Sequence, residues 1–174
     1  LSLTNGVLSA TFSSVTSTGG TNNIALAKGA GTLTGTLTIS GGALSGATGN
    51  SFDINGGTAT ISNAAAITSG SARSVNVTGL NGGTVTFSGA INDTDTGISL
   101  TSNTGATINF TGALTVSTGA NPAFTATGGG TVSATDTTST LTTTTGTALN
   151  VTSTTIGASG LTFRSISSNG ASSG

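Results

Sequence analysis

Most of the side chains that enzymes use for catalysis are scarce or missing in this chain. The 174 residues include no His, Cys, Met, Trp or Tyr, and charged residues make up only 4%. An average soluble domain has about 25% charged residues, so Thr, Ser, Gly, Asn and Ala must cover most of this surface. The composition therefore predicts a protein that is not an enzyme and that uses no cofactor.

Two classes of partner are excluded, one by the shortage of basic residues and the other by the lack of long apolar stretches. Lys28, Arg73 and Arg164 are the only basic residues, too few to neutralise the run of phosphates that supplies most of the affinity for nucleic acid. No stretch approaches the roughly 18 consecutive apolar residues of a membrane-spanning helix. We therefore expect neither nucleic-acid binding nor membrane insertion.

Low charge and many glycines do not by themselves indicate disorder. Disordered chains usually combine low hydrophobicity with a high net charge, whereas this chain has a net charge of −1 and a mean hydropathy of +0.26. Its Val, Ile, Leu, Phe and Thr residues also form alternating runs, and this alternation is typical of β-strands.

A short phrase, in which two apolar residues flank one mostly polar residue, returns through the chain. Its copies begin at residues 24, 52, 75, 98, 124 and 149, so they lie 23 to 28 residues apart. Such a period is typical of one coil of a solenoid. A second phase with Thr at alternate positions follows each phrase, as in Thr84-Val85-Thr86-Phe87, and a third phase adds one or two apolar residues.

Three strands and three Gly- or Asn-rich corners account for one coil, because Gly and Asn tolerate the positive φ angles of tight corners. We predict an all-β fold, a right-handed parallel β-helix with three short sheets and about seven coils. The right hand follows the preference of crossovers between parallel strands. Hairpins in a β-sandwich, the alternative, would give a repeat at the strand–turn–strand distance. The residues expected to point inward are Phe52, Ile54, Val75, Val77, Val85, Phe87, Ile98, Leu100, Ile108 and Phe110.

We expect residues 1–174 to form a single solenoid segment of a longer repetitive protein. After the phrase at 149–151, Ile156 is followed by an apolar run at 161–166, which places the second phase about five residues late. A frayed tail is expected over 167–174. Unpaired strand edges at the ends of a solenoid normally need a cap or another coil, so the expected partners are further repeats of the same chain or other copies of it.

Asp53, Asp93, Asp95 and Asp136 supply all of the carboxylates. Asp93 and Asp95 would lie on one face of an extended segment. Glycoside hydrolases need such a pair, because their two carboxylates must face one sugar bond. No basic or aromatic residue lies nearby in sequence to bind a sugar, so we predict no catalytic residue. Alternate Asp and Asn oxygens could instead ligate calcium, with Asp93 and Asp95 as candidates. The simpler interpretation is a solvated corner in which Asp caps its own backbone.

The outward positions of the second phase form a candidate surface ladder of hydroxyl and amide side chains. Such Thr-x-Thr arrays resemble those of ice-binding solenoids, although Thr is also a good strand former that stays neutral and soluble. The ladder contains Thr36, Thr38, Thr58, Thr60, Thr84, Thr86, Thr107, Asn109, Thr131 and Ser133.

From residue 3 to about 166, the chain resembles the repetitive β-helical regions of bacterial surface proteins, such as filamentous-haemagglutinin-like adhesins and autotransporter passengers. The repeated phrases, the Gly/Asn corners and the strands at 82–87 and 105–110 carry this resemblance. It implies an extracellular or cell-surface, non-catalytic segment of an adhesin, or a self-associating fibre of a filament or biofilm matrix. The alternatives are an ice-binding solenoid and a passive stalk for a separate binding tip. Cell-surface glycans and ice are further candidate partners.

Overall fold

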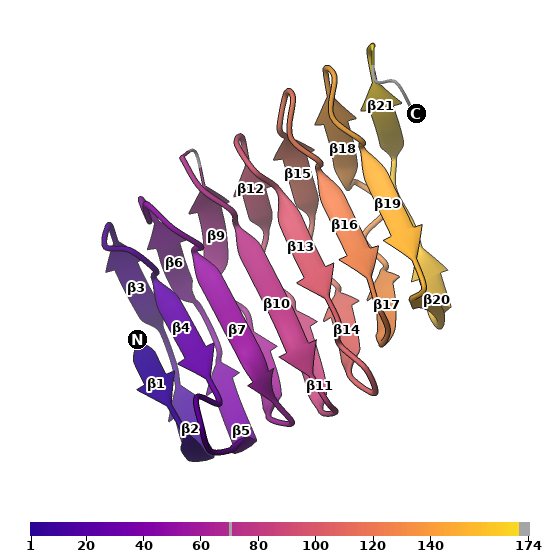
Figure 1. The fold of residues 1–174 in the computed structure, drawn as a ribbon. Coiled ribbons are helices and arrows are strands. Elements are labelled where there is room, and N and C mark those ends of the chain that lie inside the picture. The colour runs from indigo at the N-terminus through magenta and orange to yellow at the C-terminus, as the bar shows by residue number, and fades with distance from the viewer. Residues whose placement is uncertain (70, 171–174) are drawn as a thin grey trace.

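The computed structural model describes residues 1–69 and 71–170, which wind into a solenoid. Each coil contributes one strand to each of three sheets, and all strand pairs are parallel. In Figure 1 the front strands descend and the rear strands ascend as the chain advances toward its C-terminus, so the coil is right-handed. Nowhere in the described ranges does a helix occur that could span a membrane.

Each sheet contains seven strands, one from each coil. Sheet A has the order β1 (Ser2–Thr4), β4 (Ile24–Ala27), β7 (Phe52–Gly57), β10 (Val75–Leu80), β13 (Ile98–Thr101), β16 (Phe124–Thr127) and β19 (Leu149–Thr152). Sheet B has the order β2 (Gly6–Phe12), β5 (Leu33–Ile39), β8 (Thr60–Asn63), β11 (Thr84–Phe87), β14 (Thr107–Phe110), β17 (Thr131–Ala134) and β20 (Thr155–Leu161). Sheet C has the order β3 (Val15–Thr18), β6 (Gly42–Ser45), β9 (Ala66–Ser69), β12 (Ile91–Asp93), β15 (Leu114–Ser117), β18 (Thr140–Thr143) and β21 (Ser165–Ser168). Each strand of the five middle coils therefore pairs with the strands three places before and after it, which confirms the predicted three-sided β-helix.

The repeated phrase forms sheet A because its copies align from coil to coil. Ile24 pairs with Phe52, Val75 pairs with Ile98, and Phe124 pairs with Leu149. Since side chains alternate across a strand, the first and third residues of each phrase point inward and the middle residue points out. The spacing of the phrases along the sequence therefore sets the register between neighbouring strands of sheet A.

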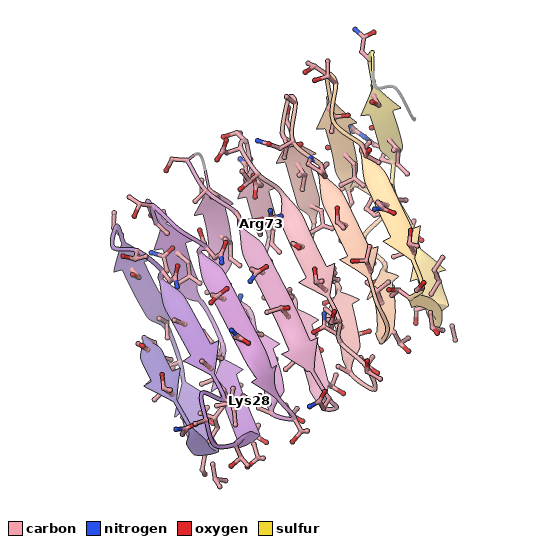
Figure 2. The ribbon with its side chains drawn as sticks, in the orientation of Figure 1. Lys28 and Arg73 are labelled. Atoms are coloured by element: carbon pink, nitrogen blue, oxygen red, sulfur yellow. The ribbon has the colours of Figure 1, made fainter. Side chains whose placement is uncertain are left out.

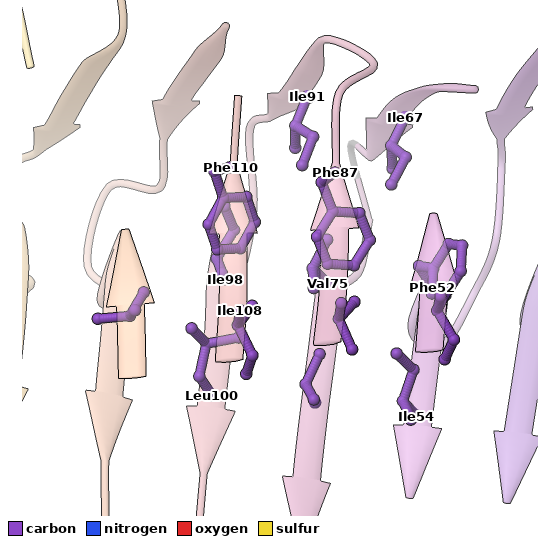
Figure 3. Packing of buried hydrophobic residues seen from close by; sticks show 14 of the residues in the cluster. Phe52, Ile54, Ile67, Val75, Phe87, Ile91, Ile98, Leu100, Ile108 and Phe110 are labelled. Atoms are coloured by element: carbon purple, nitrogen blue, oxygen red, sulfur yellow. The ribbon is translucent and has the colours of Figure 1, made fainter. Parts of the chain in front are cut away.

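The core runs along the axis of the solenoid. All ten residues predicted to point inward are buried, and none of them is more than 3% exposed. Figure 3 shows Phe52, Phe87 and Phe110 following one another inside successive coils. The centroid distances from Phe52 to Phe87, from Phe87 to Phe110 and from Phe110 to Phe124 are 5.2, 5.2 and 5.4 Å. Aromatic pairs in such contact contribute about 0.5–1.5 kcal/mol each beyond the area that they bury.

The corner between sheets A and B requires a left-handed backbone at one position of the coil. In the second coil the fourth residue after the start of the phrase, Lys28, has no positive φ, and Gly29 after it has a φ of 53°. In the other six coils this fourth residue is left-handed; it is glycine in three of them and a small polar residue, which tolerates this conformation, in the other three. The residues at this position are Asn5, Gly56, Gly79, Ser102, Gly128 and Ser153, with φ between 52° and 75°.

The corner between sheets B and C uses glycine for a different reason, which is lack of space. A Cβ atom at Gly89 would lie 2.3 Å from the carbonyl oxygen of Ala65, and one at Gly112 would lie 2.4 Å from that of Gly89. Neither glycine has a positive φ. The neighbouring coil approaches so closely here that a side chain has no room.

The last coil departs from the expected spacing in a way that the sequence did not predict. Strand β20 begins in register, with Thr155 beside Thr131, and a bulge follows, because Val132 pairs with Ile156 but Ala134 pairs with Leu161. The second phase is therefore not late, and the extra residues form a β-bulge inside the strand. Of the expected frayed tail, residues 167 and 168 belong to β21, and residues 171–174 lie outside the described residues.

We predict that Gly112→Ala destabilises the solenoid by about 1–3 kcal/mol, the usual cost of overpacking. Gly82→Ala is the matched control, because its Cβ would lie 3.5 Å from the nearest atom, the Cγ2 of Thr58. This control should leave stability unchanged or slightly raised, since alanine lowers the entropy of the unfolded chain. Denaturant unfolding followed by circular dichroism measures both. Equal losses in the two variants would contradict the close-approach explanation.

Candidate functional surfaces

Two columns of outward side chains run along sheet B, one side chain per coil. We call the first the threonine column. Strand pairing places Ser9 beside Thr36, and Thr84 follows Thr60 because Val85 pairs with Ile61. The threonine column contains Ser9, Thr36, Thr60, Thr84, Thr107, Thr131 and Thr155. The second column contains Thr11, Thr38, Ser62, Thr86, Asn109 and Ser133.

Of the predicted ladder residues, only Thr58 lies outside these columns. Thr60 pairs with Thr36, and Ser62 takes the place beside Thr38, so the register differs from the expected one by two residues. The alternation of Thr and apolar residues from 58 to 61 fits both registers equally well. The actual register places Asn63 in the core, fully buried, with its Nδ2 donating to the carbonyl of Ala65 at 3.0 Å and its Oδ1 without a partner.

The threonine column keeps its hydroxyl groups free. In the described part of the chain, no side-chain hydrogen bond joins the hydroxyls of this column to another group, and no strand of sheet B contains a charged residue. The outer face of sheet A differs, because Asn76 Nδ2 donates to Asp53 Oδ1 at 2.8 Å and Thr152 Oγ1 donates to Asn150 Oδ1 at 2.8 Å. With strands about 4.8 Å apart, the threonine column presents regularly spaced methyl and hydroxyl groups to solvent. Figure 2 shows the short side chains that cover the outer surface.

The second column is less open at its C-terminal end. Ser133 is only 6% exposed, and its Oγ donates to Asn109 Oδ1 at 2.7 Å. The bulge in β20 lies over this region, because a Cβ atom at Gly157 would be 3.6 Å from the Cβ of Ser133. The regular outer surface of sheet B therefore extends over the earlier coils.

The two calcium candidates are placed in different environments. Asp93 ends β12 and is fully buried, and its two carboxylate oxygens accept the backbone amides of Ser74 at 2.7 Å and Asp95 at 2.9 Å. Asp95 lies in the next corner and is half-buried. The extended segment that would place both carboxylates on one face is therefore absent. Among the described residues, no group of three or more acidic, His or Cys side chains could hold a metal ion.

Arg73 lies close to this acidic corner. Its Nη1 donates to the carbonyl oxygen of Thr96 at 3.0 Å. Burial lowers the pKa of Arg73, and the nearby carboxylates of Asp93 and Asp95 act in the opposite direction. Arg73 therefore binds a backbone carbonyl of this corner and lies near its two carboxylates, of which Asp93 is bound to backbone amides.

The other two carboxylates are also engaged in local contacts. Asp53 Oδ1 accepts the side-chain amide of Asn50 at 2.7 Å as well as that of Asn76. Asp136 Oδ1 accepts the hydroxyl of Thr138 at 2.6 Å and its backbone amide at 2.8 Å. The hydroxyl of Thr138, more than any other group, lowers the pKa of Asp136. The contacts of Asp136 are the self-capping role that Asp commonly takes in corners, whereas Asp53 binds side-chain amides on the outer face of β7.

A hollow of about 170 Å³ lies at the corner where the chain passes from sheet A to sheet B. Lys28 is the one ionisable residue that lines it, beside Leu33 and several small or neutral polar residues. A lone ammonium group without an acid, a base or a nucleophile gives this hollow no catalytic arrangement.

Comparison of the chain with protein-family models, with curated proteins and with solved structures gives no match. The resemblance to bacterial surface proteins therefore extends to the β-solenoid architecture and no further.

We predict that Asp93→Ala lowers the free energy of unfolding by about 1–3 kcal/mol for each buried amide left without a partner. Asp95→Ala is the control, because the Asp95 side chain is half-buried and accepts none of these amides. It should change stability by less than about 0.5 kcal/mol, as most surface substitutions do. Chemical denaturation at neutral pH compares the two. A stable Asp93→Ala variant would show that this carboxylate has no structural role.

Proposed function

We propose that this chain is a non-catalytic structural segment of an extracellular bacterial surface protein, an adhesin or a self-associating fibre. The supporting observation is the repetitive architecture: seven coils stack in three parallel sheets around one continuous core. The coils between the first and the last expose few charged residues and, among the described residues, no large hydrophobic side chain.

The non-catalytic part of the proposal is supported by the partners of the carboxylates. Asp53, Asp93 and Asp136 accept hydrogen bonds from neighbouring groups of the same chain. Asp95 has no second free carboxylate with which it could divide acid and base roles. If Asp95→Asn abolished hydrolysis of a polysaccharide by the pure protein, the proposal would be wrong.

The extracellular or cell-surface location is supported by the resemblance of the repeats to those of secreted β-helical proteins. The nearly uncharged sides suit a fibre or biofilm matrix, because neighbouring solenoids repel one another only weakly.

We predict that the purified chain forms fibres or oligomers whose population rises with protein concentration. Sedimentation velocity at several concentrations and electron microscopy of the same samples measure this. The expected diameter is that of one solenoid or of a small bundle of them. A chain that stays monomeric at high concentration would instead support a passive stalk carrying a separate binding tip.

A second candidate function is ice binding by the threonine column. It is favoured by the run of Thr36, Thr60, Thr84, Thr107 and Thr131 in five successive coils. Their hydroxyls have no partner within the described protein, so they are available to hold ordered water, while the methyl groups limit competing hydration. The absence of charge from the strands of sheet B keeps this surface uniform.

We predict that, if the threonine column binds ice, Thr84→Tyr removes most of the thermal hysteresis of the wild type, because a ring would project from the regular surface. Thr115→Tyr is the control, since Thr115 is an exposed residue of β15 on sheet C. Hysteresis is measured at matched protein concentration for all three proteins. A wild type without hysteresis, or equal loss in both variants, would eliminate this function.

A further inference from the structure

We propose that Asn81 is a modification site, at which the side-chain amide is converted to a carboxylate by deamidation without an enzyme. An Asn followed by Gly is especially prone to this reaction, because no side chain on Gly hinders the attacking amide. Four such pairs occur in the chain, at residues 5–6, 55–56, 81–82 and 169–170. The fold holds the pairs at 5–6 and 55–56 in place and leaves the pair at 81–82 free to react.

The reaction joins the backbone nitrogen of Gly to the side-chain carbon Cγ of Asn and breaks the bond from Cγ to the side-chain nitrogen. That nitrogen takes the proton of the Gly amide and leaves as ammonia, and a five-membered succinimide remains. Water opens this ring at either carbonyl and gives Asp or isoaspartate, so neither an oxidant nor a reductant is required. The peptide between Asn and Gly must rotate for the attack, so hydrogen bonds that fix this peptide slow the step.

The pair at 5–6 is held by the second coil. The amide of Gly6 donates to the carbonyl of Thr32 at 2.6 Å, and Asn5 Oδ1 accepts the amide of Gly31 at 3.0 Å. Both the attacking nitrogen and the side chain that it would attack are therefore engaged.

The pair at 55–56 belongs to β7, which pairs with β4 and with β10. The carbonyl of Asn55 accepts the amide of Lys28 at 2.9 Å, which fixes the peptide that would have to rotate. Gly56 is buried, and a Cβ atom there would lie 2.7 Å from Lys28 Cδ. Rotation of this peptide would therefore break strand pairing in sheet A.

The pair at 81–82 lies in the corner between β10 and β11, outside both strands. The amide of Asn81 donates to the carbonyl of Gly57 at 3.0 Å. Among the described residues, neither the carbonyl of Asn81 nor the amide of Gly82 takes part in a hydrogen bond, and Asn81 is exposed. The chain is therefore anchored at the nitrogen of Asn81, while the peptide that must rotate is free.

The product would change the charge of the hollow at the corner between sheets A and B. Asn81 lines this hollow together with Lys28 (Figure 2), its one ionisable residue. Deamidation replaces a neutral amide with a carboxylate, so the hollow gains a group opposite in charge to the ammonium. The modification therefore gives this part of the surface both signs of charge in place of a lone cation.

The test compares the rate of deamidation in the folded chain with the rate in the same chain unfolded by guanidinium chloride, at one mildly alkaline pH. The sequence allows each pair to be followed by itself. Trypsin, added after unfolding, cuts at Lys28, Arg73 and Arg164, and the peptides 1–28, 29–73, 74–164 and 165–174 contain one Asn-Gly pair each. Tandem mass spectrometry assigns the change from amide to acid to a single residue.

The expected result is that Asn81 reacts in the folded chain at nearly its unfolded rate. Asn5 and Asn55 should react about tenfold or more slowly in the folded chain than in the unfolded one, because the structure must open locally first. Comparing each residue with itself removes any effect of the neighbouring sequence. If Asn81 is slowed as much as Asn5 and Asn55, or if either of those reacts as fast as Asn81 in the folded chain, the inference is overturned.

Gly82→Ala identifies the attacking group. The variant keeps the space that the fold provides, since its Cβ would lie 3.5 Å from the nearest atom, but the added methyl group hinders attack and should slow deamidation of Asn81 severalfold. Gly41→Ala is the matched control, because its Cβ would also lie 3.5 Å from the nearest atom and Gly41 follows Ser40. It should leave the rate at Asn81 unchanged. Circular dichroism checks that both variants are folded, and an unchanged rate in Gly82→Ala would show that another group attacks Asn81 and that the inference is wrong.

Discussion

Each coil of this protein can bury its apolar side chains and satisfy its backbone only against the coil beside it. The amide of Phe52 donates to the carbonyl of Ser74 in the next coil, and Phe52 itself packs edge-on against Phe87. Stability is therefore a sum of contacts between neighbours, and the other features depend on keeping neighbouring coils in register at strand spacing. A corner that moved the coils apart would break core packing and hydrogen bonding together.

That constraint explains which parts of the fold could be predicted from the sequence. The inward residues of the phrases were predictable, because each must recur once per coil with a period of two inside the strand. The register of β8 was not, since Thr58 and Thr60 fit the pattern equally well and the true register places the polar Asn63 in the core. The bulge in β20 was also missed, because an apolar run that comes late looks the same as a longer corner.

The corners show a second limit of the sequence. Glycine was expected there for positive φ, which holds for Gly56 and Gly79. Gly89 and Gly112 instead leave space for a carbonyl of the preceding coil, and only the three-dimensional approach of two coils reveals this requirement. The buried Asn103 links its own corner to the preceding coil. Its Nδ2 donates to the carbonyl of Val77 at 2.9 Å, and its Oδ1 accepts the amide of Leu80 at 3.1 Å. The calcium prediction also depended on the three-dimensional structure. Asp93 is buried and accepts backbone amides, whereas Asp95 is half-buried in the next corner, so the two candidates lie in different environments.

The three faces have similar compositions and yet differ in what they can offer a partner. On sheet A, Asp53 accepts the side-chain amides of Asn50 and of Asn76 in the next coil, and Asn150 accepts the hydroxyl of Thr152, so these side chains use hydrogen-bonding capacity within the chain. On sheet B, threonine repeats at one position, and among the described residues no side-chain hydrogen bond joins the hydroxyls of the threonine column to another group. The surface that each sheet offers is set by the same register that aligns the core, because the residue at each outward position lies between inward residues that must match the neighbouring coil.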